Sequence, residues 1–380
     1  MEFDSIDEVY FQYKVFVFRS GFGVTKMGRK FTHEGDLKTV IFACSKEEKY
    51  RKRNSESNKC ISSRRKVSLS CISSRFRQQQ VLQTQAKVNY APYGIDFSGP
   101  TGRFTNGRTF ADIIAQLLGL PFAPPYMGLS AEQRSTITTG INYASGILNE
   151  TGTALGRCIS LKEQIDQFEE THGHLSADHL SKAIFLVSIG SNDYLNNYLS
   201  PLYGSSKIYT PHQFADHLLS AYNAQLTRLY VLGGRKFVVT EIGALGCMPV
   251  IVNILKPIDL CSDLVNGLVS LFNVKLPSLL NQLQYSNPGS VFVHNKSAKE
   301  FQTGLGFLWP GFRTASMPCC EVTAPGSLCL ANTQPCGDRR LNVFWDSIHP
   351  TEAVFYPMAV SCFNSTGQCT PVNVQQLTSA

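Results

Sequence analysis

The sequence predicts an α/β protein in which one parallel sheet carries helices on both faces. Three apolar runs, at 183–189, 236–242 and 291–294, have the composition of buried parallel strands. Segments with the helical spacing of apolar residues, at about 211–232 and 262–284, separate these runs. Because successive parallel strands are joined by right-handed crossovers, this alternation favours helices packed on both sides of the sheet.

Elements of the same domain are predicted before the first of these strands. A turn-rich segment covers 93–108, and a helix follows at about 109–118, ended by Gly119. A short strand running into a tight turn is expected at 140–146, and a helix at about 160–170. With 43% hydrophobic and 17% charged residues, the 380-residue chain has the composition of a globular protein with a substantial core. No apolar run approaches the roughly 18 residues that a membrane span needs.

Residues 1–80 differ from the rest of the chain in charge. They contain 17 Lys and Arg against 9 Asp and Glu, whereas residues 81–380 contain 18 against 19. The first segment is rich in Ser, Arg and Lys and has little hydrophobic period, so we expect it to be largely disordered. A nucleic-acid contact is the alternative, but no recognised binding motif accompanies the charge, and no nucleic-acid partner is expected. The predicted division is therefore a basic segment, 1–80, and a compact domain, 81–380.

Twelve cysteines favour an oxidising compartment. Nine of them follow residue 150, and four of these nine are grouped closely: Cys319, Cys320, Cys329 and Cys336. Adjacent cysteines do not match the paired C-x-x-C pattern of a zinc site, so a disulfide-bonded loop is predicted, with its pairing open. Because nine is odd, at least one of these thiols is free or pairs elsewhere. No metal or cofactor is expected.

Three Asn-x-Ser/Thr sequons agree with a secreted glycoprotein. They begin at Asn149, Asn295 and Asn364. The first residues, MEFDSIDE, are acidic where the start of a signal peptide should be basic, so the chain as written shows no signal peptide. The cysteines and sequons predict an extracellular protein, and the first segment conflicts with that prediction.

A short stretch near the C-terminus carries a candidate acid–base pair. Asp346 lies three residues before His349, and one turn can bring the carboxylate under Nδ1 of the imidazole. Pro350 biases His349 away from the helical region, which predicts a loop that leads into a helix starting near Thr351. The spacing alone equally fits an Asp and a His on a surface turn.

Two further candidates lie in loops around the predicted sheet. Asn192 follows the first strand, and its side-chain amide can point at developing negative charge; an Asx turn or a helix cap is the other interpretation. Gly146 follows a predicted strand and can offer a backbone N–H at a turn; an ordinary turn glycine is its alternative. Since ligands bind beyond the carboxyl ends of parallel strands, the loops 190–193 and 243–249 are expected to border one site.

Taken in order, these motifs resemble the plant GDSL-type esterase/lipase family of the SGNH hydrolase superfamily. The resemblance covers roughly residues 81–380 and rests on 93–97, 99–108, 140–146, 189–193, 243–249 and 344–352. It implies a three-layer α/β/α, flavodoxin-like parallel sheet, and hydrolysis of small-molecule or lipid esters by a serine. It also implies that Gly146 and Asn192 are oxyanion-hole donors, and that Asp346 and His349 are the acid and base of a triad.

The chain departs from the family at the nucleophile. The family is named after a Gly-Asp-Ser-Leu motif at the end of its first central strand, and its Ser is the nucleophile. No Gly-Asp-Ser and no G-x-S-x-G elbow occurs in this chain. The nearest candidate is Ser20, which follows a strand-like patch at 13–18; its alternative is a polar residue in a tail. The first central strand is therefore expected to be missing or replaced.

Two functions remain open. One is a serine ester hydrolase, of the carboxylesterase or lipase type, whose nucleophile is Ser20 or lies in a different N-terminal segment. The other is a catalytically inactive relic that binds an ester or a lipid. A third interpretation concerns residues 1–80 alone: they derive from a wrongly delimited or alternatively spliced first exon, because the change of charge and the missing motif coincide there.

Overall fold

The computed structural model divides the chain into two units, Met1–Lys66 and Val67–Ala380. The residues it describes are 23–31, 37–45, 69–73, 87–123, 130, 146–172, 175–298, 312, 314–323, 328–365 and 367–380. The strand-like patch predicted at 13–18 lies outside the described residues, as does nearly all of the strand predicted at 140–146.

The first unit contains one antiparallel strand pair. Strand β1 (Gly23–Phe31) pairs with β2 (Leu37–Ser45), with register irregularities near both ends of β1. The sequence predicted a largely disordered segment here. The structure pairs a run that contains Thr39, Val40, Ile41 and Phe42, which are β-branched and aromatic residues that favour strands. That the segment is largely disordered stays a prediction.

The second unit is built on a five-stranded sheet. Its order is β3 (Leu69–Ser73), β4 (Ile184–Ser188), β5 (Lys236–Thr240), β6 (Val291–Asn295) and β9 (Cys369–Thr370). The first four strands are parallel, as predicted, and β9 is antiparallel to β6. The sheet is therefore mixed at one edge, because the chain returns to it after the last long helix instead of crossing over.

Strand β3 places part of the first segment in the sheet. All of its residues pair in parallel with β4, from Leu69 opposite Ile184 to Ser73 opposite Ser188. The first central strand was predicted to be missing or replaced, and a strand of different sequence occupies the position next to β4. The second unit consequently begins at Val67, before the predicted boundary at residue 81.

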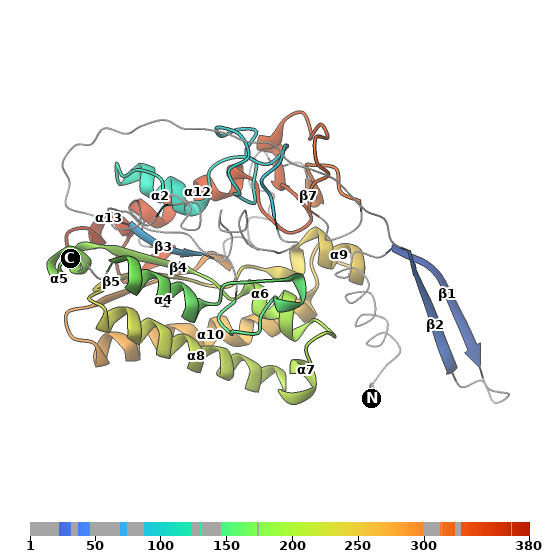
Figure 1. Ribbon diagram of the computed structural model, residues 1–380, viewed down its shortest axis with the longest axis horizontal. Coiled ribbons are helices and arrows are strands. Elements are labelled where there is room, and N and C mark those ends of the chain that lie inside the picture. Colours follow the sequence, from blue (N-terminus) through green and yellow to red (C-terminus); the bar gives the residue numbers. More distant parts are fainter. Residues whose placement is uncertain are drawn as a thin grey trace. The chain divides into compact units, whose positions relative to one another are not determined.

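Helices cover one face of the sheet through an apolar cluster. Helices α2 (Phe110–Leu117), α12 (Glu352–Asn364) and α13 (Val374–Leu377) supply one side of this cluster. The strands supply the other side with Ile184, Leu186, Val238 and Val293. Helices α2 and α12 lie side by side above the sheet in Figure 1.

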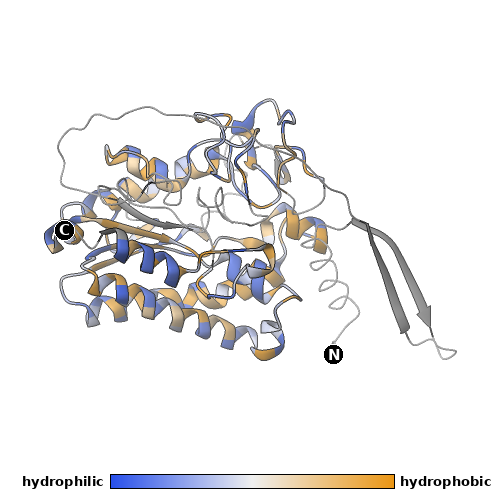
Figure 2. Ribbon diagram, viewed as in Figure 1, coloured by the Kyte–Doolittle hydropathy of each residue, from blue (hydrophilic) through white to orange (hydrophobic). Residues whose placement is uncertain are grey.

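The opposite face packs against α4 (Leu161–His172), α8 (Pro211–Val231) and α10 (Asp263–Ser286). The alternate strand residues Phe185 and Phe237 point to this side, and Phe168 of α4 meets the Phe185 ring edge-on at 5.5 Å between centroids. Figure 2 shows the apolar residues on the strands and along one side of these helices. The predicted three-layer α/β/α architecture is confirmed.

The remaining elements are short and connect the layers. They are η3 (Thr153–Leu155), α5 (Ala177–Lys182), α6 (Ser191–Asp193), η4 (Tyr194–Tyr198), α7 (Ser205–Ile208), η5 (Leu245–Cys247), α9 (Pro249–Leu255), β7 (Thr314–Pro318), η6 (Arg339–Leu341) and β8 (Asn342–Phe344). Strands β7 and β8 form a separate parallel pair. No local pattern indicated this pair, because the three residues of β8 are too few to show one.

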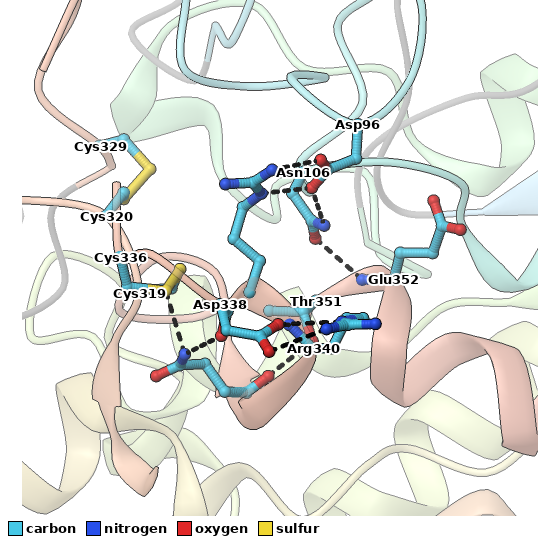
Figure 3. Close-up of a disulfide and its surroundings, with 12 residues drawn as sticks. Asp96, Asn106, Cys319, Cys320, Cys329, Cys336, Asp338, Arg340, Thr351 and Glu352 are labelled. Carbon is cyan, nitrogen blue, oxygen red and sulfur yellow. Dashed lines mark hydrogen bonds and ion pairs between the residues drawn. A yellow bond between two sulfur atoms is a disulfide. The ribbon is translucent and has the colours of Figure 1, made fainter. Parts of the chain in front are cut away.

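Four disulfides join cysteines of the second unit. They are Cys247–Cys261, Cys319–Cys336, Cys320–Cys329 and Cys362–Cys369. The prediction of a disulfide-bonded loop in the 319–336 region is confirmed, and its two bridges are nested (Figure 3). Cys158 is the thiol left over from the nine and lies 3.3 Å from the carbonyl oxygen of Gly152. Within the described parts of the chain, no helix is long and apolar enough to span a bilayer.

Candidate active site

Asp346 and His349 lie in a tight loop between β8 and α12. The Oδ1 atom of Asp346 accepts the backbone N–H groups of Ile348 and His349 at 2.8 and 2.7 Å. The backbone N–H of Trp345 donates to the carbonyl of His349 at 2.7 Å and closes the loop. As a result, Nδ1 of His349 lies 2.6 Å from Oδ2 and 2.9 Å from Oδ1 of Asp346. The local backbone brings the two predicted residues into direct contact.

The pair is buried, and its charge is stabilised. Asp346 is 0% exposed and His349 is 7% exposed. Burial raises the pKa of Asp346, but the charge of His349 and hydrogen bonds from His349 and Tyr93 outweigh it, so this pKa lies below its usual value. The ring of Phe104 lies against the imidazole, with 4.6 Å between centroids. Asp346 is therefore an ionised acceptor that holds Nδ1 of His349, while Phe104 packs against the ring.

The turn-rich segment 93–108 holds this loop from the outside. Thr105 Oγ1 donates to the carbonyl of Pro350 at 3.0 Å. The side-chain oxygen of Asn106 accepts the backbone N–H of Glu352 at 2.9 Å, at the start of α12 (Figure 3). These contacts clamp the residues that follow His349.

Ion pairs fasten the same segment at two more points. Glu352 forms a salt bridge with Arg108, whose Nε lies 2.9 Å from Oε1. Asp96 receives two hydrogen bonds from Arg339 at 2.6 Å each and one from Asn106 at 2.8 Å. Segment 93–108 and the residues around α12 are thus linked by charged hydrogen bonds, which are stronger than neutral ones.

A second buried carboxylate organises the predicted oxyanion loops. Asp193 accepts the backbone N–H groups of Ile147 and Leu148 at 2.8 and 3.0 Å and the hydroxyl of Thr151 at 2.7 Å. A Cβ on Gly146 would lie 2.6 Å from Oδ1 of Asp193 and 2.4 Å from Thr151, so no larger residue fits this position unchanged. Asp193 therefore ties the Gly146 turn to the helix that carries Asn192.

Asn192 lies in α6, directly after β4. Its Oδ1 accepts Nδ2 of Asn196 at 3.1 Å, which orients the amide group. The turn before it requires Gly190, which has φ 122°, and a Cβ there would lie 2.6 Å from Ile242. Burial raises the pKa of Asp193 to about 6, although its hydrogen bonds oppose the shift.

A cavity of about 140 Å³ borders both loops. Ser191, next to Asn192, and Pro350, next to His349, both line it. Its other walls come from the segment 93–108, the loop 243–249, the strand ends, α2 and α12, and they are mainly apolar: Phe104, Phe110, Ala111, Leu186, Ala244, Met248, Phe344, Phe355 and Met358. The loops 190–193 and 243–249, which were predicted to border one site, share this cavity through Ser191, Gly243, Ala244 and Met248. The described residues that line it do not include Gly146, Asn192, Asp346 or His349.

The candidate nucleophile is not placed at the site as directly as Asp346 and His349 are. Ser20 lies outside the described residues. Strand β3 ends at Ser73, whose backbone is in register with Ser188, two residues before Gly190. The backbone of the replaced strand thus brings a serine to the carboxyl edge of the sheet, which the sequence reasoning missed because it assigned this segment to a tail.

Comparison with known proteins decides the family. The model of the GDSL-like Lipase/Acylhydrolase family matches residues 68–355. The chain belongs to this family. It is 40% identical to GDSL esterase/lipase At1g29670 of Arabidopsis thaliana over 311 residues. The matched residues cover 77% of this chain and 85% of the relative. GDSL esterase/lipase At1g71691 of the same plant is 41% identical over 314 residues, 77% of this chain and 80% of the relative.

Membership of the GDSL family confirms the resemblance read from the ordered motifs, and with it a serine ester hydrolase ancestry. Sequence reasoning did not single out Tyr93, Asn106 or Asp193, which hold the site together. Tyr93 and Asn106 meet partners 253 and 246 residues further along the chain, so no local pattern reveals them. For Asp193, a buried carboxylate directly after the candidate Asn192 was the available signal.

Proposed function

We propose that the second unit hydrolyses carboxylic esters with His349 as general base and Asp346 as the carboxylate that orients it. One observation carries the proposal: Nδ1 of a nearly buried imidazole lies 2.6 Å from a fully buried carboxylate. With Nδ1–H directed at the carboxylate, Nε2 is the nitrogen that exchanges protons. Family membership supports the same reaction, since the matching relatives are named esterase/lipases.

In the proposed mechanism His349 takes the proton of a serine hydroxyl while its oxygen attacks the ester carbonyl. Asp346 stabilises the imidazolium, which then protonates the departing alcohol. Water, activated by His349, hydrolyses the acyl-enzyme in the second step. The backbone N–H of Gly146 and the amide of Asn192 stabilise the oxyanion.

The cavity supports an apolar acyl group as part of the substrate. Phe110 and Ala111 from α2 and Phe355 and Met358 from α12 line it away from the loops. Apolar walls favour a hydrocarbon chain over a charged group. We therefore propose small-molecule or lipid esters of fatty acids as the substrate class.

Turnover of p-nitrophenyl acetate, butyrate and octanoate tests this function. We expect hydrolysis by the wild-type chain and a loss on the order of 10⁴ or more in kcat for His349→Ala. His212→Ala, on the exposed side of α8, is the matched control and should retain wild-type rates. Equal turnover by the wild type and His349→Ala would refute the proposed role of His349.

A second function, ester or lipid binding without turnover, is favoured by the absence of Gly-Asp-Ser from the chain. Its signature is saturable binding of a fluorescent fatty acid together with no hydrolysis of any of the three esters. Hydrolysis that disappears in His349→Ala counts against it.

We also propose an extracellular location, with the four disulfides as support. Asn149 and Asn364 are exposed, whereas Asn295 is fully buried in β6. Glycosylation is therefore expected at Asn149 and Asn364 and not at Asn295, which glycopeptide mass spectrometry of protein from a plant host can check. That the basic N-terminal segment is separate from the hydrolase domain stays a prediction; strand β3, which lies within residues 1–80, belongs to the sheet of the second unit.

A further inference from the structure

We propose that Tyr93 is a positioning residue of the acid–base pair: its hydroxyl holds Asp346 in place, and the segment closed by the Cys320–Cys329 disulfide holds Tyr93. This inference rests on the proposed function of Asp346 and His349. Tyr93 would affect the reaction by positioning Asp346, without touching the substrate.

The hydroxyl of Tyr93 completes the hydrogen bonds of the carboxylate. It donates to Oδ2 of Asp346 at 2.6 Å, and the same oxygen lies 2.6 Å from Nδ1 of His349. The other oxygen, Oδ1, receives two backbone N–H groups of the loop. A carboxylate with both oxygens held by several donors cannot rotate without breaking one of them.

The ring of Tyr93 is itself fixed. It is 1% exposed and meets Tyr90, Phe104 and Trp345 edge-on, with centroids 5.5, 6.2 and 6.3 Å away. Phe104 is the ring that also lies against His349. Movement of Tyr93 would therefore disturb both members of the pair.

The disulfide segment closes a circuit around Asp346. The backbone N–H of Cys329 donates to the Tyr93 hydroxyl at 3.1 Å. Cys329 is bonded to Cys320 (Figure 3). The backbone N–H of Cys320 donates at 3.0 Å to the carbonyl of Trp345, the neighbour of Asp346. The chain thus returns to Asp346 through a covalent bond, which limits how far Tyr93 and Asp346 can separate.

Burial and the charge of Asp346 keep the Tyr93 hydroxyl the donor, and Asp346 the acceptor, in the hydrogen bond between them. The titratable groups that face the carboxylate are Tyr90, Tyr93 and His349. Burial, followed by the charge of Asp346, raises the pKa of Tyr93 well above its usual value. Tyr93 therefore stays a protonated donor wherever the enzyme works.

Tyr93→Phe and Tyr90→Phe form a matched pair for the test. Both hydroxyls bond to the backbone of Cys329, but only that of Tyr93 reaches Asp346. The readout is the titration midpoint of His349 by NMR with labelled histidine, assigned with His349→Ala. Loss of the Tyr93 donor leaves more negative charge on Asp346, which stabilises the imidazolium.

We expect Tyr93→Phe to raise the His349 midpoint by roughly half a pH unit. Tyr90→Phe should leave the midpoint unchanged. In ester turnover, Tyr93→Phe should lower kcat about tenfold with little change in KM, because orientation and not binding is lost. A merely structural role would lower the stability of both variants alike and leave the His349 midpoint in place.

Equal midpoints in wild type and Tyr93→Phe would overturn the inference. If Tyr93→Phe does not fold, the double variant Cys320→Ser/Cys329→Ser decides: a smaller shift in the same direction supports the inference, and no shift overturns it. The His349 titration is visible without catalysis, so an inactive chain would refute the proposed function and leave this inference open to its own result.

Discussion

Asp346 and Asp193 are both fully buried carboxylates that accept two backbone N–H groups and one hydroxyl. Their pKa values nevertheless move in opposite directions. Burial raises the pKa of Asp193 to about 6, whereas that of Asp346 falls below its usual value in spite of burial. The difference is His349, whose charge lowers the pKa of Asp346, whereas Asp193 accepts hydrogen bonds from the neutral groups of Ile147, Leu148 and Thr151.

At Asp193, hydrogen bonds alone do not offset the rise in pKa that burial causes. Asp193 joins the Gly146 turn to α6, a structural task for which a protonated or an ionised carboxyl can serve. Asp346 has to be ionised to stabilise an imidazolium, and its partner ensures that it is. Asp193 thus holds the shape of a turn, whereas Asp346 supplies a negative charge to the site.

The largest expected effect comes from removing the charge of Asp346. Asp346→Asn should lower kcat for ester hydrolysis on the order of 10⁴-fold, because the amide favours the wrong imidazole tautomer. Asp338→Asn is the control, since Asp338 forms an ion pair with the exposed Arg340 at the surface. Steady-state kinetics measure both, and a loss below tenfold for Asp346→Asn would contradict the assigned role.

The opposite pKa directions predict opposite pH dependences of stability. The folded-state pKa of Asp193 is raised, so its contribution is full below about pH 4 and is lost as pH rises through 6, by about 3 kcal/mol. The free energy of unfolding of wild type minus that of Asp193→Asn should therefore fall between pH 4 and 7. The folded-state pKa of Asp346 is lowered, so its contribution to stability is present above about pH 4 and is lost as pH is lowered. The free energy of unfolding of wild type minus that of Asp346→Asn should therefore decrease as pH falls below about 4.

Urea unfolding at several pH values measures these two differences. Because each variant is compared with wild type at the same pH, the titrating groups that do not contact the substituted aspartate cancel. If the two free-energy differences changed with pH in the same direction, the opposite pKa shifts of Asp193 and Asp346 would be contradicted.

A smaller effect is expected at the turn that Asp193 holds. Gly146→Ala places a methyl group 2.6 Å from the Asp193 carboxylate, so we expect a loss of about 1–3 kcal/mol in stability and a lower kcat. Gly267→Ala in α10 has open space around its Cβ and should instead stabilise the fold by about 0.5–1 kcal/mol. Thermal unfolding of both variants checks the sign; stabilisation by Gly146→Ala would show that the turn is not closely packed.

Most of the central sheet and the contact between Asp346 and His349 could be predicted from the sequence. Apolar runs revealed β4, β5 and β6, because buried parallel strands leave a continuous signal, and the spacing of Asp346 and His349 predicted their contact. Strand β3 escaped because Ser and Cys dilute its apolar residues. Its place in the sheet comes from pairing with β4, which no local pattern encodes.

The groups that hold the site could not be predicted for a different reason. Tyr93 and Asn106 act on residues near the other end of the chain, so only the fold joins them. The disulfide pairing was open because four close cysteines allow three connectivities. The structure selects the nested one, and this choice places Cys329 against Tyr93.

The most direct test of the central claim is intact-mass spectrometry after treatment with a fluorophosphonate, followed by peptide mapping. We expect one adduct on the wild-type chain and none on His349→Ala, because the loop that carries Asp346 and His349 activates a single serine. Mapping to Ser73 would place the nucleophile at the end of β3, and mapping to Ser20 would place it in the first unit. A wild-type chain that forms no adduct would contradict the claim that Asp346 and His349 activate a serine in this protein.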